Sequence, residues 1–245
     1  MSDEPPWLAG LDGCRTGWVA AFVHPTGDEV RVRIVPRFAD VLGAPEAPTI
    51  LAVDMPIGLP DRIGPDGRGP ERAIRPLLGA RQSSVFPVPP RAAIYAADFG
   101  AACTAALAAS EPPRKVSKQL YMIAPKIREV DAFLRANPVA ADRVYEVHPE
   151  LAFWRLNGER ALGEPKKVKG VCYEPGLALR RQLLITAGMP ERIVTGPAPR
   201  GAGADDLLDA LACAAIARRL HAGTAQSFPE SPGRDAFGLR VAIWA

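Results

Sequence analysis

One segment near the C-terminus restricts the fold more than any other part of the chain. From Leu207 to Ala217 the sequence reads LLDALACAAIA, and Asp209 is its only polar residue. At about 100° per residue, the apolar side chains cover every direction around a helix axis. A helix of about Ala204 to Leu220 must therefore be enclosed by the rest of the protein along this segment, and it carries one acid into the interior.

Four short segments upstream read as strands of a mixed sheet. The first three lie at residues 8–12, 18–23 and 30–35. In the third, apolar residues alternate with Arg31 and Arg33, which predicts that one face of this strand is exposed to solvent. The three segments together predict an antiparallel meander near a sheet edge. Ile50–Val53 is apolar throughout, and this is typical of a strand in the middle of a parallel or mixed sheet.

Helical patterns dominate the rest of the chain. We expect helices at about 38–42, 71–78, 92–109, 117–136, 175–187 and 204–220. Residues 143–148 and 239–244 read as further strands, and Pro149 can open a helix because its missing N–H is not needed there. Residues 61–91 are rich in Arg, Gly and Pro and predict a long functional loop. We expect one α/β domain over residues 1–245.

The composition excludes several classes of protein. With 245 residues, 48% of them hydrophobic and 23% charged, the chain is typical of soluble globular proteins, and a net charge of +3 permits an anionic partner without demanding one. The four cysteines form no C-x-x-C pair, so we expect reduced thiols in a cytoplasm. The N-terminus, MSDEPPW, has no signal-peptide pattern, and no stretch reaches about 18 apolar residues, so we expect no membrane insertion.

Acidic residues stand at the ends of several predicted elements. Asp12 ends the first strand, and Asp54 follows a buried strand at its carboxyl end, which is the edge where ligands bind in open α/β sheets. Asp205, Asp206 and Asp209 fall within an arc of about 100° on the last helix and can address one point. The alternatives are turns that bond Asp12 or Asp54, and simple first-turn acids on the helix. Asp209, inside the helix, requires a metal or an arginine to neutralise it.

These carboxylates together predict an oxygen-rich site. Carboxylates and water suit Mg²⁺ or Mn²⁺, whereas zinc would require clustered His or Cys ligands. Such a site can hold one or two divalent ions that activate a water and stabilise the leaving oxygen in phosphodiester hydrolysis. We therefore predict that four acids are both metal ligands and catalytic residues: Asp12, Asp54, Asp206 and Asp209.

A further group of polar residues lies on the segment RVYEVHPE. Glu146 and His148 are two residues apart and share one face of the predicted strand. We include Glu146 among the candidate catalytic residues and His148 among those that contact substrate. Glu150 falls in the first turn of the following helix, where we expect it to complement the helix dipole.

Six motifs occur in order between residues 8 and 222: GLDGCRTGWVAA, AVDMPIGLP, GARQSSVFPVPPR, KIREVD, YEVHPELAF and DDLLDALACA. Together they resemble the bacterial and archaeal family of domain of unknown function 429, described as predicted RNase H-like nucleases. The resemblance implies an RNase H-like mixed sheet, an antiparallel three-strand meander plus parallel strands, flanked by helices.

The resemblance also implies where the site acids lie. In the RNase H-like superfamily they come from the first strand, the fourth strand and a C-terminal helix, which here correspond to Asp12, Asp54 and the pair Asp206 and Asp209. The spacing of that pair looks like the last helix of Holliday-junction resolvases. This chain departs from the pattern at Asp54, because the fourth-strand acid is often Glu in those nucleases.

Basic and hydroxyl side chains supply candidates for holding a phosphate or a nucleic-acid backbone. In the motif GARQSSVFPVPPR they are Arg81, Gln82, Ser83, Ser84 and Arg91, and elsewhere they are Arg15, Lys126, Arg128, Lys166, Lys167 and Lys169. The alternative for each is a solvated basic face. We expect Phe86, Tyr121 and Trp154 in the core and not as base-stacking platforms.

These observations favour a metal-dependent nuclease that uses Mg²⁺ or Mn²⁺ and acts on DNA or RNA. One alternative is a protein that binds a nucleotide or nucleic acid without catalysis. Another is a phosphoryl-transfer enzyme like the actin-like ATPases of the same fold, whose first hairpin also follows Asp-Gly and grips phosphate. Those enzymes usually need two such domains, for which 245 residues leave little room.

Overall fold

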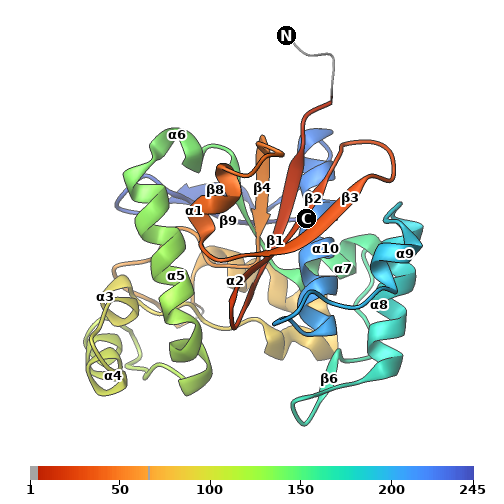
Figure 1. Ribbon diagram of the computed structural model, residues 1–245. Coiled ribbons are helices and arrows are strands. Elements are labelled where there is room, and N and C mark those ends of the chain that lie inside the picture. The colour runs from red at the N-terminus through yellow and green to blue at the C-terminus, as the bar shows by residue number, and fades with distance from the viewer. Residues whose placement is uncertain (1–4, 66) are drawn as a thin grey trace.

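A seven-stranded mixed sheet lies at the centre of the computed structural model, which describes residues 5–65 and 67–245 (Figure 1). Its strand order is β3-β2-β1-β4-β5-β9-β8. The strands are β1 (Leu8–Cys14), β2 (Gly17–Val23), β3 (Val30–Val35), β4 (Ile50–Val53), β5 (Val144–Val147), β8 (Ser227–Arg234) and β9 (Arg240–Trp244). Strands β1 to β3 form an antiparallel meander, and β1, β4, β5 and β9 run parallel. The expected mixed α/β fold is confirmed.

Helices cover both faces of this sheet. They are α1 (Phe38–Leu42), α2 (Gly69–Ile74), the 3₁₀ segment η1 (Arg75–Ser84), α3 (Arg91–Ile94), α4 (Phe99–Ala108), α5 (Lys118–Ala136), α6 (Pro138–Ala141), α7 (Pro149–Leu156), α8 (Glu174–Thr186), α9 (Glu191–Val194) and α10 (Ala204–His221). In Figure 1, α3 to α6 lie to one side of the sheet and α7 to α10 to the other. Within the described residues, none of these helices has the length and apolarity that a membrane span requires.

Successive strand residues feed two hydrophobic cores, one on each face of the sheet. Leu8 belongs to the core beneath α7 and α10, whereas its neighbour Ala9 and then Leu11 belong to the core beneath α5. This alternation follows from the two-residue period of a strand. The segment Leu207–Ala217 of α10 is buried at every position, as its sequence predicts.

Gly10 allows α10 to pack directly against β1. A Cβ atom at Gly10 would lie 2.1 Å from the nitrogen of Ala214 and 2.3 Å from the carbonyl oxygen of Ala210. No side chain larger than hydrogen fits between the two backbones at this crossing. The close approach places the first turns of α10 beside the carboxyl end of β1.

Several elements differ from the expectation. The single helix expected at 92–109 is two, α3 and α4, and the Asp98 side chain caps the second by accepting from the Ala101 N–H at 2.8 Å. The expected loop at 61–91 contains α2 and η1, with a break at Gly79, where φ is 51°. Two strands of two residues each, β6 (Lys167–Val168) and β7 (Val171–Cys172), form a separate hairpin that is too short to give a periodic signal.

The two edges of the main sheet are built differently. At one edge, the Arg33 guanidinium on β3 binds Glu46 at 2.5 Å and lies over the Phe22 ring. At the other edge, β8 includes Pro229 and Pro232, and its pairing with β9 is irregular between Phe228 and Gly233. The prolines explain why the sequence does not predict β8, because proline is rare inside strands. The first four residues of the N-terminal segment, on which the expectation about secretion rests, lie outside the described residues.

Candidate functional site

A pocket of about 530 Å³ opens at the carboxyl ends of β1, β4 and β5. Helix α5 contributes one wall, and α10 and the segment before β6 contribute another. The predicted site residues that line it are Asp12, Asp54, Arg81, Ser83, Ser84, Lys126, Glu146, His148, Asp206 and Asp209. Of the other predicted residues, Lys166 and Lys167 also line it, whereas Arg15 and Arg91 do not.

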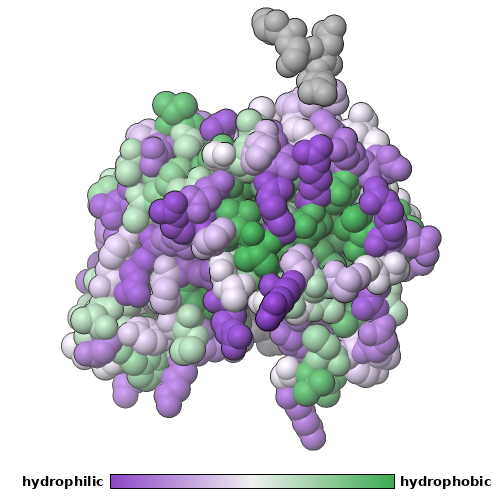
Figure 2. Space-filling model, in the orientation of Figure 1, coloured by the Kyte–Doolittle hydropathy of each residue, from purple (hydrophilic) through white to green (hydrophobic). Residues whose placement is uncertain are grey.

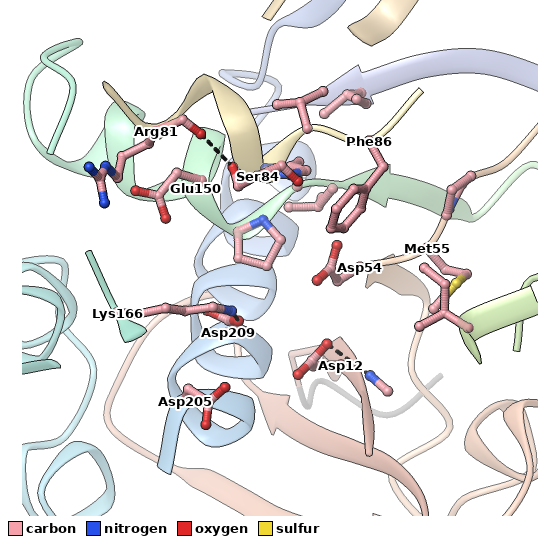
Figure 3. Close-up of a pocket in the computed structure, with 18 of the residues that line it drawn as sticks. Asp12, Asp54, Met55, Arg81, Ser84, Phe86, Glu150, Lys166, Asp205 and Asp209 are labelled. Atoms are coloured by element: carbon pink, nitrogen blue, oxygen red, sulfur yellow. Dashed lines mark hydrogen bonds and ion pairs between the residues drawn. The ribbon is translucent and has the colours of Figure 1, made fainter. Parts of the chain in front are cut away.

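The sheet itself places Asp12 beside Asp54. Strands β1 and β4 pair in parallel with Leu11 opposite Val53, and the backbone N–H of Asp54 donates to the carbonyl of Leu11 at 2.9 Å. The two acids therefore follow directly from paired residues of neighbouring strands (Figure 3). Asp12 also accepts a hydrogen bond from the N–H of Gly13 at 2.9 Å, which satisfies one of its oxygens locally.

The third acid of this group comes from α10, which Gly10 seats against β1. Asp209 is only 2% exposed, and its Oδ2 forms an ion pair with the ammonium of Lys166. Its Oδ1 is buried and, within the described residues, has no hydrogen-bond partner. Of the two partners expected for Asp209, the arginine is replaced by a lysine from another segment, and the metal stays a prediction.

The three carboxylates repel one another. Burial raises the pKa of Asp54 to about 7, and the negative charge of Asp209 adds to the shift. Burial also raises the pKa of Asp12 well above its usual range, followed by repulsion from Asp54 and Asp209. Burial alone would lower the pKa of Lys166, but Asp209 and Asp12 raise it by more, so the lysine stays charged. Three acids share one ammonium, so the site attracts further positive charge.

The raised pKa of Asp54, which burial causes first and repulsion second, predicts a pH dependence of stability in the absence of divalent ions. The pKa of Asp54 is about 7 in the folded protein against 3.8 for the unperturbed group, so its contribution to stability is complete below about pH 4 and is lost as pH rises to about 7. We expect the free energy of unfolding of Asp54→Asn, relative to wild type, to increase between pH 5 and pH 7.5 in urea titrations with EDTA. The exposed Asp28→Asn is the control. A constant difference between Asp54→Asn and wild type over that range would contradict the raised pKa.

The two other acids of α10 have local partners. Asp205 binds the Lys167 ammonium at 2.5 Å and accepts from the Cys172 thiol at 3.5 Å. Although burial opposes it, Lys167 lowers the pKa of Asp205. Asp206 accepts from the N–H of Gly203 at 2.8 Å and so caps the helix, which is the first-turn role considered above. Both still line the pocket.

Glu146 lies at the back of the pocket in a buried network. Its carboxylate accepts from the Arg68 guanidinium at 2.6 Å and from the N–H of Ile57 at 2.8 Å. Burial raises the pKa of Glu146 to about 7 against the opposing effect of Arg68. Arg68 also binds Glu71, so these groups fix the segment after β4. The sequence carries no periodic or motif signal that would single out Arg68.

Glu150 does more than complement the dipole of α7. The Arg180 guanidinium donates to both of its oxygens at 2.8 Å, and Arg180 is only 1% exposed. Arg91, which was predicted to contact substrate, is similarly bound by Asp131 and Asp235 outside the pocket. These are buried structural ion pairs.

Cationic and polar groups also line the pocket. Arg81 projects from η1, and its Nε is buried without a hydrogen-bond partner among the described residues (Figure 3). His148 contacts the Ser84 carbonyl through Nε2 at 3.3 Å, whereas its Nδ1 has no partner in the same part of the chain. The Lys126 ammonium donates to the Gly17 carbonyl at 2.6 Å. Arg81 therefore leaves an N–H free for an anion, whereas the free Nδ1 of His148 is an acceptor, because Nε2 donates to the Ser84 carbonyl and burial lowers the pKa of the imidazole.

The acids as they stand are not arranged as a metal site. In residues 5–65 and 67–245, no group of three or more His, Cys, Asp or Glu side chains is close enough to hold a metal ion. Lys166 lies on Asp209 instead. Phe86, which was expected in the core, packs partly against it but also lines the pocket near Asp54 (Figure 3).

Comparison with known proteins gives one match. A family model described as Protein of unknown function (DUF429) matches residues 10–234, a range that includes all the acids of the pocket. No curated protein and no solved structure matches the chain.

Proposed function

The chain belongs to the DUF429 family, and from its pocket we propose that it is a metal-dependent nuclease of the RNase H-like type that uses Mg²⁺ or Mn²⁺. The observation that carries this proposal is the convergence of Asp12, Asp54 and Asp209 from three separate elements at one end of the pocket. The antiparallel meander followed by parallel strands, with the last acid on a C-terminal helix, supports the same assignment.

The residues present suit a hard divalent cation. The donors are all carboxylate oxygens, which Mg²⁺ and Mn²⁺ prefer. Asp209 Oδ1 is buried without a hydrogen-bond partner among the described residues, so its lone pairs are available to a cation. Burial and, after it, mutual repulsion raise the pKa values of Asp12 and Asp54, and a divalent ion would relieve the repulsion. We propose these three as ligands, with Asp206 at the rim.

The other side chains of the pocket would bind the substrate or position the ligands. Arg81, with Ser83 and Ser84 nearby in the sequence, would hold a phosphate in the pocket. A guanidinium suits this role because it can donate two parallel hydrogen bonds to phosphate oxygens. A cation held by these carboxylates would supply activation of a water and stabilisation of the negative charge on the leaving oxygen. Glu146 keeps the segment after β4, and with it Asp54, in position. Lys126 on α5 offers a further contact for the nucleic-acid backbone.

Cleavage of short DNA and RNA substrates tests the proposal. We expect wild type to cleave at least one of them with Mn²⁺ and none in EDTA. We expect Asp54→Asn to lower the rate by at least about a hundredfold, since the substitution removes a charged ligand, a loss on the order of 2.7 kcal/mol. The matched control is Asp28→Asn, an exposed Asp in the turn between β2 and β3. Full cleavage in EDTA, or by Asp54→Asn, would contradict the proposal.

One observation favours a second function, the binding of a nucleotide or nucleic acid without catalysis. Lys166 already neutralises Asp209, while the Arg81 guanidinium keeps an N–H unpaired among the described residues. Such a site would take up a phosphate without a metal. Retention of a labelled oligonucleotide in EDTA, with no cleavage in Mn²⁺, would identify this function in place of the first.

A further inference from the structure

The hairpin formed by β6 and β7 stands apart from the rest of the fold. It pairs with no strand of the main sheet, and all four of its strand residues are exposed. Val168 and Val171 are 45% and 70% exposed at its tip. Figure 2 shows it projecting at the lower edge of the molecule, across a hollow from the lobe of α3 and α4. A two-stranded hairpin of this kind is marginally stable by itself, so its position depends on what holds it.

Polar contacts to the carboxylates of α10 hold one side of this hairpin. The Lys166 ammonium binds Asp209, the Lys167 ammonium binds Asp205 at 2.5 Å, and the Cys172 thiol donates to Asp205 at 3.5 Å. Figure 3 shows Lys166 extending across the pocket to meet Asp209. The hairpin is therefore docked on the acids by charge.

The base of the hairpin is fixed independently of these charges. The N–H of Tyr173 donates to the carbonyl of Lys166 at 2.9 Å. A Cβ at Gly176 would lie 1.9 Å from the carbonyl oxygen of Pro165, so α8 packs directly on the segment that leads into β6. The side chains of Lys166 and Lys167 can thus move away from Asp209 and Asp205 while these backbone contacts hold the two ends of the hairpin in place.

From this arrangement we propose that Lys166 occupies the place of the divalent cation in the metal-free protein and must withdraw from Asp209 before the cation binds. When two cations bind the same buried carboxylate, each lowers the affinity of the other, because their charges repel. Lys166 is thus a residue that sets the affinity of the site for Mg²⁺ or Mn²⁺. When released from Asp209, its ammonium is free to contact a phosphate of the substrate. This inference rests on the proposed metal-dependent function.

The competition has a measurable size. If Lys166 holds Asp209 in roughly nine molecules of ten, the apparent dissociation constant for the cation is about tenfold above its intrinsic value. Lys166→Met keeps a side chain of similar length and removes the charge. We expect it to bind Mn²⁺ at least about tenfold more tightly than wild type. The control is Lys169→Met, which alters an exposed lysine on the same hairpin and should bind Mn²⁺ as wild type does.

Calorimetric titration of each purified protein with Mn²⁺ measures these affinities, and hydrogen exchange of residues 166–172 in wild type with and without Mn²⁺ gives a second readout. We expect tighter binding by Lys166→Met and faster exchange of the wild-type hairpin when Mn²⁺ is present. Unchanged or weaker binding by Lys166→Met would overturn the role of Lys166 while the metal site stands. If that variant does not fold, unchanged exchange on saturation of wild type would overturn it. Absence of Mn²⁺ binding by both proteins would overturn the metal site itself.

Discussion

Gly10→Ala is expected to destabilise the protein strongly. The new methyl group would lie 2.1 Å from one backbone atom of α10 and 2.3 Å from another, and neither is the movable end of a side chain. Relief requires α10 to move off β1, which would open the core around Leu207–Ala217. Overpacking in a core typically costs 1–3 kcal/mol, and we expect a loss of at least about 3 kcal/mol here because only backbone can yield.

Gly163→Ala is the matched control for this substitution. Among the described residues, no atom lies within 4 Å of a Cβ at Gly163, and its φ is not in the left-handed region. We expect this variant to unfold at the same denaturant concentration as wild type or slightly above it, since alanine restricts the unfolded chain. Equal midpoints for Gly10→Ala and wild type in urea titrations would show that α10 does not lie on β1 as described.

Arg180→Met is expected to destabilise the protein by about 3–5 kcal/mol, because it leaves the Glu150 carboxylate buried without its partner. It also removes the donor to the Gly176 carbonyl at 2.9 Å. For a chain of this length the melting temperature should fall by roughly 10 °C. The neighbouring Arg181→Met should cost less than about 1 kcal/mol, since Arg181 pairs with an exposed Glu174.

A double variant separates the charge from the packing. Arg180→Met combined with Glu150→Met removes both buried charges, and such replacements are often close to neutral. We expect the double variant to regain most of the melting temperature that Arg180→Met loses. Equal melting temperatures for the Arg180 and Arg181 single variants would contradict a buried ion pair between α8 and α7.

The elements that the sequence predicts well are those with a strong local signal. The meander and β4 follow from apolar runs bounded by turn residues, and the burial of α10 follows from its lack of a polar face. Asp12 and Asp54 were predicted to meet because each ends a strand of the same sheet, and the parallel register of β1 and β4 brings them together. In each case the deciding information lies within a few residues.

The features that sequence reasoning missed depend on contacts between distant segments. Lys166 was recognised as basic, but its pairing with Asp209, 43 residues further along, depends on how the hairpin docks. Arg68 meets Glu146 across 78 residues of chain. No periodicity or propensity reports such a pairing. The strand β8 was missed for a different reason, since its prolines argue locally against a strand that tertiary packing nevertheless forms.

The construction of the two sheet edges has a consequence for self-association. An exposed edge strand usually offers N–H and C=O groups to a strand from another molecule and so invites aggregation. On β3 the charged side chains Arg31 and Arg33 disfavour pairing with another edge, and on β8 Pro229 and Pro232 have no N–H to donate. Both edges therefore discourage β-pairing between the main sheets of two molecules.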